Sequence, residues 1–413
     1  MVNYYSVNTN FYGKNTPAEL VKEFGSPLYV YNEKIFRERC REMKNLVTYP
    51  HFKPNYSIKA NSNLHLLKIA LEEGMSADAM SPGEIFVLEK AGFSKENIFY
   101  ISNNVSADEL KFAIDRGITV SIDSLSQLEL FGKINRGGSL SIRFNSGVGA
   151  GHHEKVVTGG KKTKFGINID KVDKVKEILE RYDLKLIGIN QHIGSLFMEG
   201  SKYVESVHYL LDLAKQFKDL EFIDMGGGFG IPYNKQAGEE RLDLKALGQK
   251  LDKVLFDFSK EYGRELTFKI EPGRYISAEC ASIIGTVNSV KLNYETTFVG
   301  TDVGFNVLVR PAMYDSHHDI EVYSDTPSNE TKAVTVVGNI CESGDILAKD
   351  RVLPVCKEGD LIGVMDAGAY GFSMSSNYNN RLRPAEVLIQ QDGTPRLIRR
   401  RDTFEDLVRN FEV

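Results

Sequence analysis

Four short segments of the chain carry side chains that could do chemistry together. The first holds Lys59, which follows the apolar run 56–58 and precedes small and polar residues. A lysine amine in a partly desolvated site loses proton affinity and can condense with a carbonyl group. The ordinary alternative is a solvated lysine just beyond a strand, because lysine is seldom buried without a partner. Lys59 alone does not decide between the two.

The other three segments offer an imidazole, a backbone anion site and a carboxylate. His192 could stack on an aromatic cofactor or act as an acid or base. The three glycines Gly226, Gly227 and Gly228 would let backbone N–H groups approach an anion without obstruction by a Cβ. Glu271 could hold a proton on a ring nitrogen, and Arg274 offers a planar fork for phosphate or carboxylate. Each also has an ordinary interpretation, as a structural histidine, a tight glycine turn or a Glu-Pro-Gly turn.

These side chains fall at the ends of regularly spaced apolar runs. Eight strand-like runs alternate with amphipathic segments of helical period, at 55–58, 75–79, 98–102, 119–122, 140–144, 186–191, 221–225 and 267–270. Such alternation predicts parallel strands joined by helices. Eight strands over about 240 residues suit a closed (β/α)8, TIM-like barrel. An open, doubly wound sheet is the alternative.

A barrel of this kind carries its active site at the carboxyl ends of the strands. Lys59 follows the first run, His192 the sixth, the glycines the seventh and Glu271 the eighth. The loops after strands seven and eight of barrels commonly hold phosphate. A lysine, a phosphate cradle and a carboxylate for a ring nitrogen at one rim together predict a pyridoxal phosphate site.

The alternation of strand-like runs and amphipathic segments ends at about residue 275. Short alternating runs with few helical segments follow, at 281–290, 296–301, 320–323, 333–337, 360–365, 385–389 and 395–399, and they predict a β domain. We therefore expect three parts: an N-terminal segment, 1–33, that packs with the β domain; a pyridoxal-phosphate-binding barrel, 34–275; and a C-terminal β-sandwich or β-barrel domain, 276–413. The run 28–31 could instead lead into the barrel.

The composition excludes several classes of protein. The net charge is -5 and no long basic stripe is present, so no nucleic-acid partner is expected. The basic cluster 396–401 is short and suits a strand edge or a structural pairing site. The sequence has no apolar stretch of about 18 residues, and its first residues lack the charged and apolar parts of a signal peptide. We expect a cytoplasmic protein that does not span a membrane.

The spacing of cysteines and histidines argues against a metal site. Cysteines are scattered without CxxC spacing, which disfavours both zinc and a disulfide framework: Cys40, Cys280, Cys341 and Cys356. The glycine-rich segment 147–153 lacks the spacing of a phosphate loop, and we interpret it as a rim loop. His152 and His153 are adjacent, so their side chains would diverge in extended backbone. We expect no metal.

The motifs in combination resemble the alanine-racemase-fold (type III) pyridoxal phosphate decarboxylases. The resemblance rests on the segments Tyr56–Asn61, His192–Ser195, Gly226–Gly230, Glu271–Arg274, Cys341–Asp345 and Gly368–Gly371. It covers nearly the whole chain, from about Gly25 to Arg401. Within that family, Arg310–Tyr314 and Ser375–Asn379 are most similar to members that act on meso-diaminopimelate. The resemblance therefore implies decarboxylation of meso-2,6-diaminopimelate to L-lysine and CO2, the last step of lysine biosynthesis.

The resemblance also implies roles for individual residues. Lys59 would bind the cofactor covalently, His192 would stack on its ring and Glu271 would pair with the ring nitrogen. The phosphate would be surrounded by Ser195, Gly226, Gly227, Gly228, Gly273 and Arg274, with Tyr370 as a further cofactor contact. Cys341 would be the general acid that returns a proton to the α-carbon, a task that suits a thiol at neutral pH.

The far end of the substrate would be read by a mixed set of charged and aromatic side chains, namely Arg274, Arg310, Tyr314, Glu342 and Tyr370. Diaminopimelate carries an ammonium and a carboxylate there, so an acid and a base are both needed. In this family Cys341 and Tyr370 reach into the partner subunit's barrel. The resemblance thus implies a homodimer with shared active sites that acts on a small amino acid.

Some positions depart from the family pattern, and other functions remain open. Asn190 stands where the family often has histidine, Val307 where aspartate is common, and Asp315 where glycine is usual. The alternatives are a decarboxylase for ornithine, arginine, carboxynorspermidine or a carrier-linked amino acid, and a non-catalytic relative that only binds the cofactor. A racemase with this barrel would need a catalytic tyrosine in place of the cysteine chemistry.

Overall fold

The computed structural model describes residues 4–145, 147 and 163–412, and the chain divides into two compact units. The barrel unit comprises Arg37–Ile231 and Arg241–Ile276. The β unit comprises Met1–Phe36, Pro232–Glu240 and Ser277–Val413, so a short segment beyond the seventh barrel strand groups with it. Apart from Gly147, the expected rim loop 147–153 lies outside the described residues.

The barrel unit is built on eight parallel strands that close into a ring. In ring order they are β2 (Phe52–Ser57), β3 (Ser76–Ala79), β4 (Ile98–Ile101), β5 (Thr119–Ile122), β6 (Ser139–Asn145), β8 (Lys185–Asn190), β9 (Phe222–Gly227) and β10 (Thr267–Glu271). The two-residue β7 (Ile167–Asn168) pairs with the last two residues of β6. Because β10 pairs with β2 and β5 pairs with β6, the sheet is closed, which confirms the predicted barrel over the open sheet.

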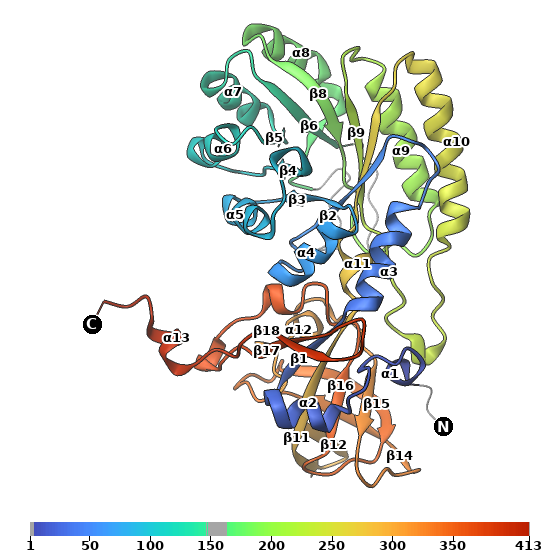
Figure 1. Ribbon diagram of the computed structural model, residues 1–413, viewed down its shortest axis with the longest axis vertical. Coiled ribbons are helices and arrows are strands. Elements are labelled where there is room, and N and C mark those ends of the chain that lie inside the picture. The colour runs from blue at the N-terminus through green and yellow to red at the C-terminus, as the bar shows by residue number, and fades with distance from the viewer. Residues whose placement is uncertain (1–3, 146, 148–162, 413) are drawn as a thin grey trace. The chain divides into compact units, whose positions relative to one another are not determined.

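Helix α3 (Glu33–Lys44) precedes β2, and seven further helices of the described chain follow barrel strands and lie around the ring (Figure 1). These seven are α4 (Leu64–Glu72), α5 (Pro82–Ala91), α6 (Ala107–Ile114), α7 (Leu125–Ile134), α8 (Val172–Arg181), α9 (Ser201–Ala214) and α10 (Leu244–Tyr262). Local sequence sets where several begin. Ser106 and Glu109 form a reciprocal capping box at α6, and Ser81 caps α5 ahead of a proline at its first position.

The β unit contains a nine-stranded mixed sheet. Its strands are β1 (Leu28–Asn32), β11 (Ala281–Asn293), β12 (Thr296–Thr301), β13 (Ile320–Tyr323), β14 (Thr331–Val337), β15 (Ile346–Pro354), β16 (Leu361–Val364), β17 (Ala385–Ile389) and β18 (Pro395–Arg399). Strand β1 lies between β11 and β17, antiparallel to the first and parallel to the second. The run 28–31 therefore pairs within this sheet and does not begin the barrel.

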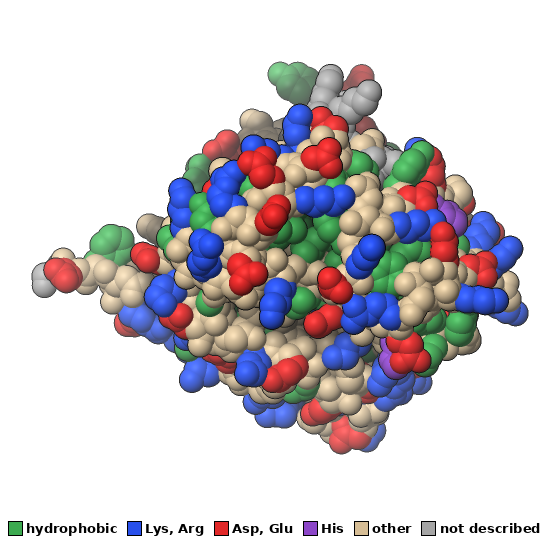
Figure 2. Space-filling model, turned by 90° about the horizontal axis from the view of Figure 1, so that it is seen from above, with side chains coloured by type: hydrophobic (Ala, Val, Ile, Leu, Met, Phe, Trp, Pro, Cys, Tyr) green, Lys and Arg blue, Asp and Glu red, His purple; other side chains and the backbone are tan. Residues whose placement is uncertain are grey.

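Short helices complete the described part of the chain. They are α1 (Tyr5–Asn8), α2 (Pro17–Phe24), α11 (Arg274–Ser277), α12 (Arg310–Tyr314) and α13 (Phe404–Val408). Across the described ranges, no helix is both long and apolar enough to span a membrane. One face of the molecule shows lysines and arginines interspersed with aspartates and glutamates and not gathered in a single field (Figure 2).

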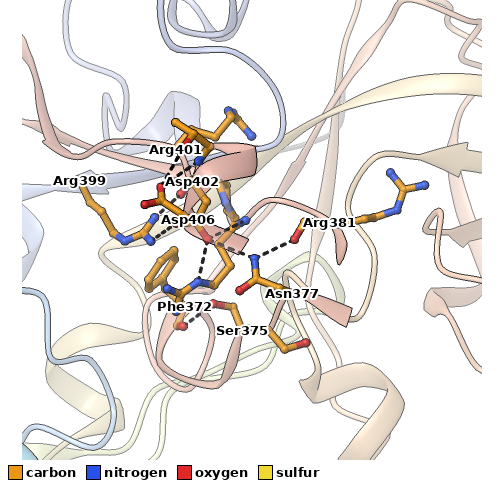
Figure 3. A network of polar contacts seen from close by, with 12 residues as sticks. Phe372, Ser375, Asn377, Arg381, Arg399, Arg401, Asp402 and Asp406 are labelled. Carbon is orange, nitrogen blue, oxygen red and sulfur yellow. Dashed lines mark hydrogen bonds and ion pairs between the residues drawn. The ribbon is translucent and has the colours of Figure 1, made fainter. Parts of the chain in front are cut away.

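The basic cluster near the C-terminus makes structural ion pairs (Figure 3). Arg399 donates to Asp402, and its guanidinium lies 4.6 Å from the ring centre of Phe372. Asp402 also accepts from the Asn377 amide at 3.1 Å, and the same amide donates to the Arg381 carbonyl at 2.9 Å. The expected pairing role of 396–401 is confirmed for Arg399, and the bonds of Asn377 hold the segment Ser375–Asn379 against Asp402.

Candidate active site

Lys59 lies in a tight turn directly after β2 and is half-buried. The turn is closed by a hydrogen bond from the Ala60 N–H to the Ser57 carbonyl at 3.1 Å. Gly273, in the loop after β10, packs against this turn so closely that a Cβ there would lie 3.0 Å from the Ser57 Cβ and 3.1 Å from the Ala60 Cβ. The missing side chain of Gly273 thus brings the β10 loop against the lysine turn.

Glu271, the last residue of β10, is buried, and one of its oxygens lacks a partner. Its side chain is 3% exposed, and Oε1 has no hydrogen bond within the described structure. Burial raises the pKa of Glu271 well above its ordinary value, and the carboxylates of Asp224 and Asp78 raise it further, whereas Lys59 and Arg143 lower it. An unsatisfied buried carboxyl oxygen is costly, so this arrangement calls for a hydrogen-bond donor.

Asp78 and Asp224 are site residues that the sequence interpretation missed. Asp78 accepts from the Ser57 hydroxyl at 3.0 Å, and burial raises its pKa to about 7 against the opposing effect of Lys59. Asp224 accepts from the Asn55 amide at 3.4 Å, and burial raises its pKa to about 6. Both acids lie inside apolar runs. An aspartate within a predicted buried strand was the signal that could have revealed them.

His192 follows β8 and has a defined tautomer. The backbone N–H of Gly227 donates to His192 Nδ1 at 3.1 Å, so Nδ1 is an acceptor and the proton of the neutral ring sits on Nε2. Nδ1 also lies 3.7 Å from Glu271 Oε2 but has no proton to give it. Burial lowers the pKa of His192 well below its ordinary value, and the positive charges of Lys59 and Arg143 act in the same direction. The site therefore presents a neutral imidazole.

The three glycines at the carboxyl end of β9, of which Gly226 and Gly227 are its last two residues, permit very close backbone approaches. A Cβ on Gly226 would lie 2.2 Å from the Gln191 carbonyl oxygen, one on Gly227 would lie 2.0 Å from that of Glu271, and one on Gly228 would lie 2.4 Å from that of Gly194. The N–H groups of Gly226 and Gly227 donate to Asp224 and His192. The first two glycines thus organise the acid and the imidazole, while Gly228 holds the loop that carries Ser195.

Ser195 and Arg274 form a hydrogen-bonded pair with one positive charge near Gly228. Arg274 is 6% exposed, and its Nη2 and Nε atoms donate to the Ser195 hydroxyl at 2.9 and 3.3 Å. A guanidinium and a hydroxyl next to closely packed glycine backbone are well suited to bind a phosphate. The barrel unit therefore brings together every barrel residue that the sequence predicted.

The remaining predicted residues lie in the β unit. Arg310 is the first residue of α12 and is 1% exposed, and Tyr314 is the last residue of that helix. Asp315, the departure from glycine, follows with a left-handed φ of 50°, which explains why glycine is usual there. Tyr370, in the segment after β16, has a φ of 58°.

Cys341 and Glu342 lie on the exposed loop between β14 and β15 and contact the 375–380 segment. The Asn379 amide donates to Cys341 Sγ at 3.2 Å and accepts from the Cys341 N–H at 3.1 Å. Glu342 accepts from the Tyr378 hydroxyl at 2.7 Å. The structure thus explains the Ser-Ser-Asn-Tyr-Asn motif as a support for the cysteine loop, a role that the sequence did not indicate.

The other two departures from the family pattern have structural explanations. Asn190 ends β8 inside the barrel and accepts from the hydroxyls of Ser121 at 2.6 Å and Ser141 at 3.4 Å. Val307 is buried, and its carbonyl accepts from the Tyr29 hydroxyl at 2.7 Å. Neither position belongs to the group of Lys59, His192 and Glu271.

The barrel residues fit pyridoxal phosphate. A protonated ring nitrogen would supply the donor that Glu271 Oε1 lacks, and its positive charge would offset the crowded carboxylates. The neutral His192 ring offers a flat face, and Arg274 with Ser195 suits the phosphate. Lys59 supplies the amine. The chemistry of this donor set matches the cofactor group by group.

Comparison with known proteins identifies the family. The model of the pyridoxal binding domain of pyridoxal-dependent decarboxylases matches residues 33–278. The diaminopimelate decarboxylase of Methanothermobacter thermautotrophicus is 42% identical over 405 residues, which cover 96% of this chain and 94% of that protein. The chain belongs to the diaminopimelate decarboxylase family. The family's enzyme from Archaeoglobus fulgidus is 37% identical, with 95% of this chain and 94% of that protein covered.

Solved structures of the family share the fold over nearly the whole chain. A crystal structure of a diaminopimelate decarboxylase superposes with a TM-score of 0.88 at 34% identity, covering 95% of this chain and 94% of that one. The Helicobacter pylori family member, complexed with L-lysine, gives a TM-score of 0.87 at 31% identity, covering 95% and 98%. The resemblance found in the sequence is therefore confirmed at the level of family and fold.

Proposed function

We propose that this chain decarboxylates meso-2,6-diaminopimelate to L-lysine and CO2 with pyridoxal phosphate, as the last step of lysine biosynthesis. The observation that carries the proposal is the buried Glu271, whose unsatisfied oxygen lies in a cluster with Lys59 and the neutral His192. This cluster occurs in a chain that is 42% identical, almost end to end, to a diaminopimelate decarboxylase.

The barrel residues would hold the cofactor. The Lys59 amine would link to its aldehyde, Arg274 and Ser195 would bind its phosphate beside Gly228 and Gly273, and His192 would lie against its ring. Pyridoxal phosphate supplies a conjugated, protonated ring that accepts the electron pair left behind when CO2 departs. Glu271 would keep the proton on the ring nitrogen, because its buried carboxyl group has no hydrogen-bond donor at Oε1 among the described residues.

The β-unit residues would complete the chemistry. The Cys341 thiol would give a proton to the α-carbon after CO2 leaves, since a thiol is a competent acid at neutral pH. Arg310 would bind the distal carboxylate, and Glu342 would bind the distal ammonium, with Arg274, Tyr314 and Tyr370 at the same end. A site with both a guanidinium and a carboxylate distinguishes diaminopimelate from ornithine, because the distal end of ornithine carries only an ammonium.

The proposal includes a homodimer in the cytoplasm. In the resembling family Cys341 and Tyr370 act in the partner subunit's barrel. The exposure of the Cys341 loop on its own unit supports this assignment, because a general acid must reach the substrate. Sedimentation velocity should show a dimer, and mixing a Lys59→Ala protein with a Cys341→Ala protein should restore activity through hybrid dimers.

The test of the function is release of CO2 from four amino acids: meso-diaminopimelate, ornithine, arginine and carboxynorspermidine. We expect turnover of diaminopimelate, with L-lysine as the co-product, and at least about 10-fold lower kcat/KM for the others, because each lacks the distal carboxylate and loss of one charge-assisted pair is worth about 1.5–3 kcal/mol. Faster turnover of a substrate without a distal carboxylate would contradict the proposal.

A further inference from the structure

We propose that His318 is a positioning residue that fixes the Arg310 guanidinium for the distal carboxylate and thereby sets substrate selectivity. The inference rests on the proposed function, in which Arg310 reads that carboxylate. His318 was not among the residues that the sequence or the family resemblance indicated. Its assignment comes from the hydrogen bonds around a fully buried arginine.

The hydrogen bonds of His318 define its protonation. Its Nδ1 lies 2.7 Å from the carbonyl oxygen of Met365. A carbonyl only accepts, so Nδ1 carries the proton. Nε2 lies 2.8 Å from Nη1 of Arg310, and an arginine only donates, so Nε2 accepts with its lone pair. Both bonds are satisfied at once only by the neutral imidazole with its proton on Nδ1.

The surroundings of Arg310 show why this contact fixes it. Nη2 donates to the Ser316 hydroxyl at 3.3 Å, and the guanidinium lies 4.6 Å from the ring centre of Tyr233. The His318 ring meets the same Tyr233 ring edge to face, with centroids 5.3 Å apart. His318, Ser316 and Tyr233 are uncharged, so these contacts orient the guanidinium without cancelling its positive charge.

The backbone makes His318 a firm anchor. His318 is 1% exposed and lies just before β13, while Met365 directly follows β16, the strand that pairs with β13. The imidazole therefore connects the first residue of α12 to the frame of the sheet. Arginine has about 2 kcal/mol of rotamer entropy to lose, and an anchor that is already in place reduces the loss on binding.

The test compares two inhibitors that differ only in the distal carboxylate. L-Lysine retains it, whereas 1,5-diaminopentane does not. Competitive inhibition constants for both should be measured with the cofactor-loaded wild-type enzyme and with His318→Leu, His318→Gln and His317→Leu. His317→Leu is the matched control, because His317 is the neighbouring histidine and bonds Asp319 and Arg351.

We expect His318→Leu to weaken lysine about 10-fold or more, to leave diaminopentane within about twofold, and to raise KM for diaminopimelate more than it lowers kcat. His318→Gln, which keeps an acceptor for Arg310, should restore much of the lysine preference. His317→Leu should keep the wild-type ratio. Bound cofactor, measured by its visible absorbance, should be equal in all variants.

The outcomes separate this proposal from the function on which it rests. A wild-type enzyme that does not prefer lysine over diaminopentane would contradict the proposed function itself. A wild-type preference that survives in His318→Leu, or that falls equally for both inhibitors, would overturn the role of His318 and leave the proposed function intact.

Discussion

Buried charges in the two units are satisfied to very different degrees. In the β unit, Lys235 donates to both carboxylate oxygens of Asp366 at 2.7 Å and to the Pro232 carbonyl at 2.7 Å, and it lies 3.3 Å from Glu279. In the barrel unit, Glu271 and Asp78 each keep one buried oxygen without a hydrogen bond from the described residues.

The difference separates a structural charge cluster from a functional one. Burial opposes the charge of Lys235, but Asp366 and Glu279 hold its pKa above the ordinary value, so the cation belongs to the folded chain. Burial also raises the pKa of Asp366 to about 7, so the two clusters differ in their hydrogen bonds and not in the direction of their carboxyl pKa shifts. The carboxylates at the barrel end have pKa values raised by burial and by one another. In the proposed site, the cofactor would place a cationic, proton-bearing group beside these carboxylates and would offset the cost of burying them.

The largest effect is expected for Glu271→Gln, which tests whether the barrel carboxylate is functional. The amide cannot hold a proton on the ring nitrogen, so we expect kcat for diaminopimelate to fall by about 10²–10⁴-fold. The cofactor-free variant should unfold at the same or a higher denaturant concentration than the wild type, because a crowded buried carboxylate has been removed. Equal activity, or a clear loss of stability, would show that Glu271 is a structural charge like Asp366.

Removing Lys235, the cation that pairs with Asp366 and Glu279, should instead lower stability. Lys235→Met leaves Asp366 and Glu279 buried without their cation, and breaking such a pair costs about 3–5 kcal/mol of unfolding free energy. Urea unfolding measures the loss. Lys215→Met is the control, because Lys215 pairs with Asp212 and Glu261 at the surface and should change stability by less than about 1 kcal/mol. A similar result for both lysines would remove the contrast.

Cys341→Ala tests whether the β unit also contributes chemistry. We expect kcat to fall about 100-fold through loss of the general acid, while bound cofactor and unfolding free energy stay close to wild type, since Cys341 is exposed. Cys356→Ala, which changes a buried cysteine of the same unit, should keep kcat. Unchanged turnover in Cys341→Ala would assign the proton to another group.

The predicted effect with the smallest lower bound, about 1 kcal/mol, is on the pH dependence of stability. Burial raises the pKa of Asp78 from 3.8 to about 7, so the folded state binds its proton more tightly than the unfolded state. This contribution to stability is present below about pH 4 and is lost as pH rises toward 7. The wild-type protein without cofactor should therefore lose unfolding free energy between pH 4 and pH 8 through Asp78. The Asp78→Asn variant should lose about 1–4 kcal/mol less over the same range. Parallel stability curves would contradict the assignment.

The sequence predicted the barrel better than the β unit for a physical reason. Each barrel strand is a short apolar run bounded by an amphipathic helix, so period and length agree. Strand β15 was missed because its centre, Lys349-Asp350-Arg351, is charged, Asp350 has a φ of 50°, and its pairing with β14 is irregular. Helix α2 was also missed, although Thr16 and Glu19 form a capping box that local sequence could have revealed.

The sequence predicted the site residues at the strand ends and missed those within the strands. Lys59 and His192 follow strands and Glu271 ends one, and the barrel rule places such residues together. Asp78 and Asp224 lie within strands, where the apolar pattern conceals an acid. The support of Arg310 by His318 depends on how β13 pairs with β16, which no local spacing encodes.

Borohydride reduction of the cofactor-loaded protein, followed by peptide mass spectrometry, tests the central claim most directly. Lys269 is the informative rival, because burial lowers its pKa to about 8, yet it lies over the Phe222 ring at 3.8 Å. The proposed site predicts a pyridoxyl phosphate adduct on the peptide that contains Lys59 and on no other, and none in Lys59→Ala. An adduct on Lys269, or decarboxylation that persists in Lys59→Ala, would contradict it.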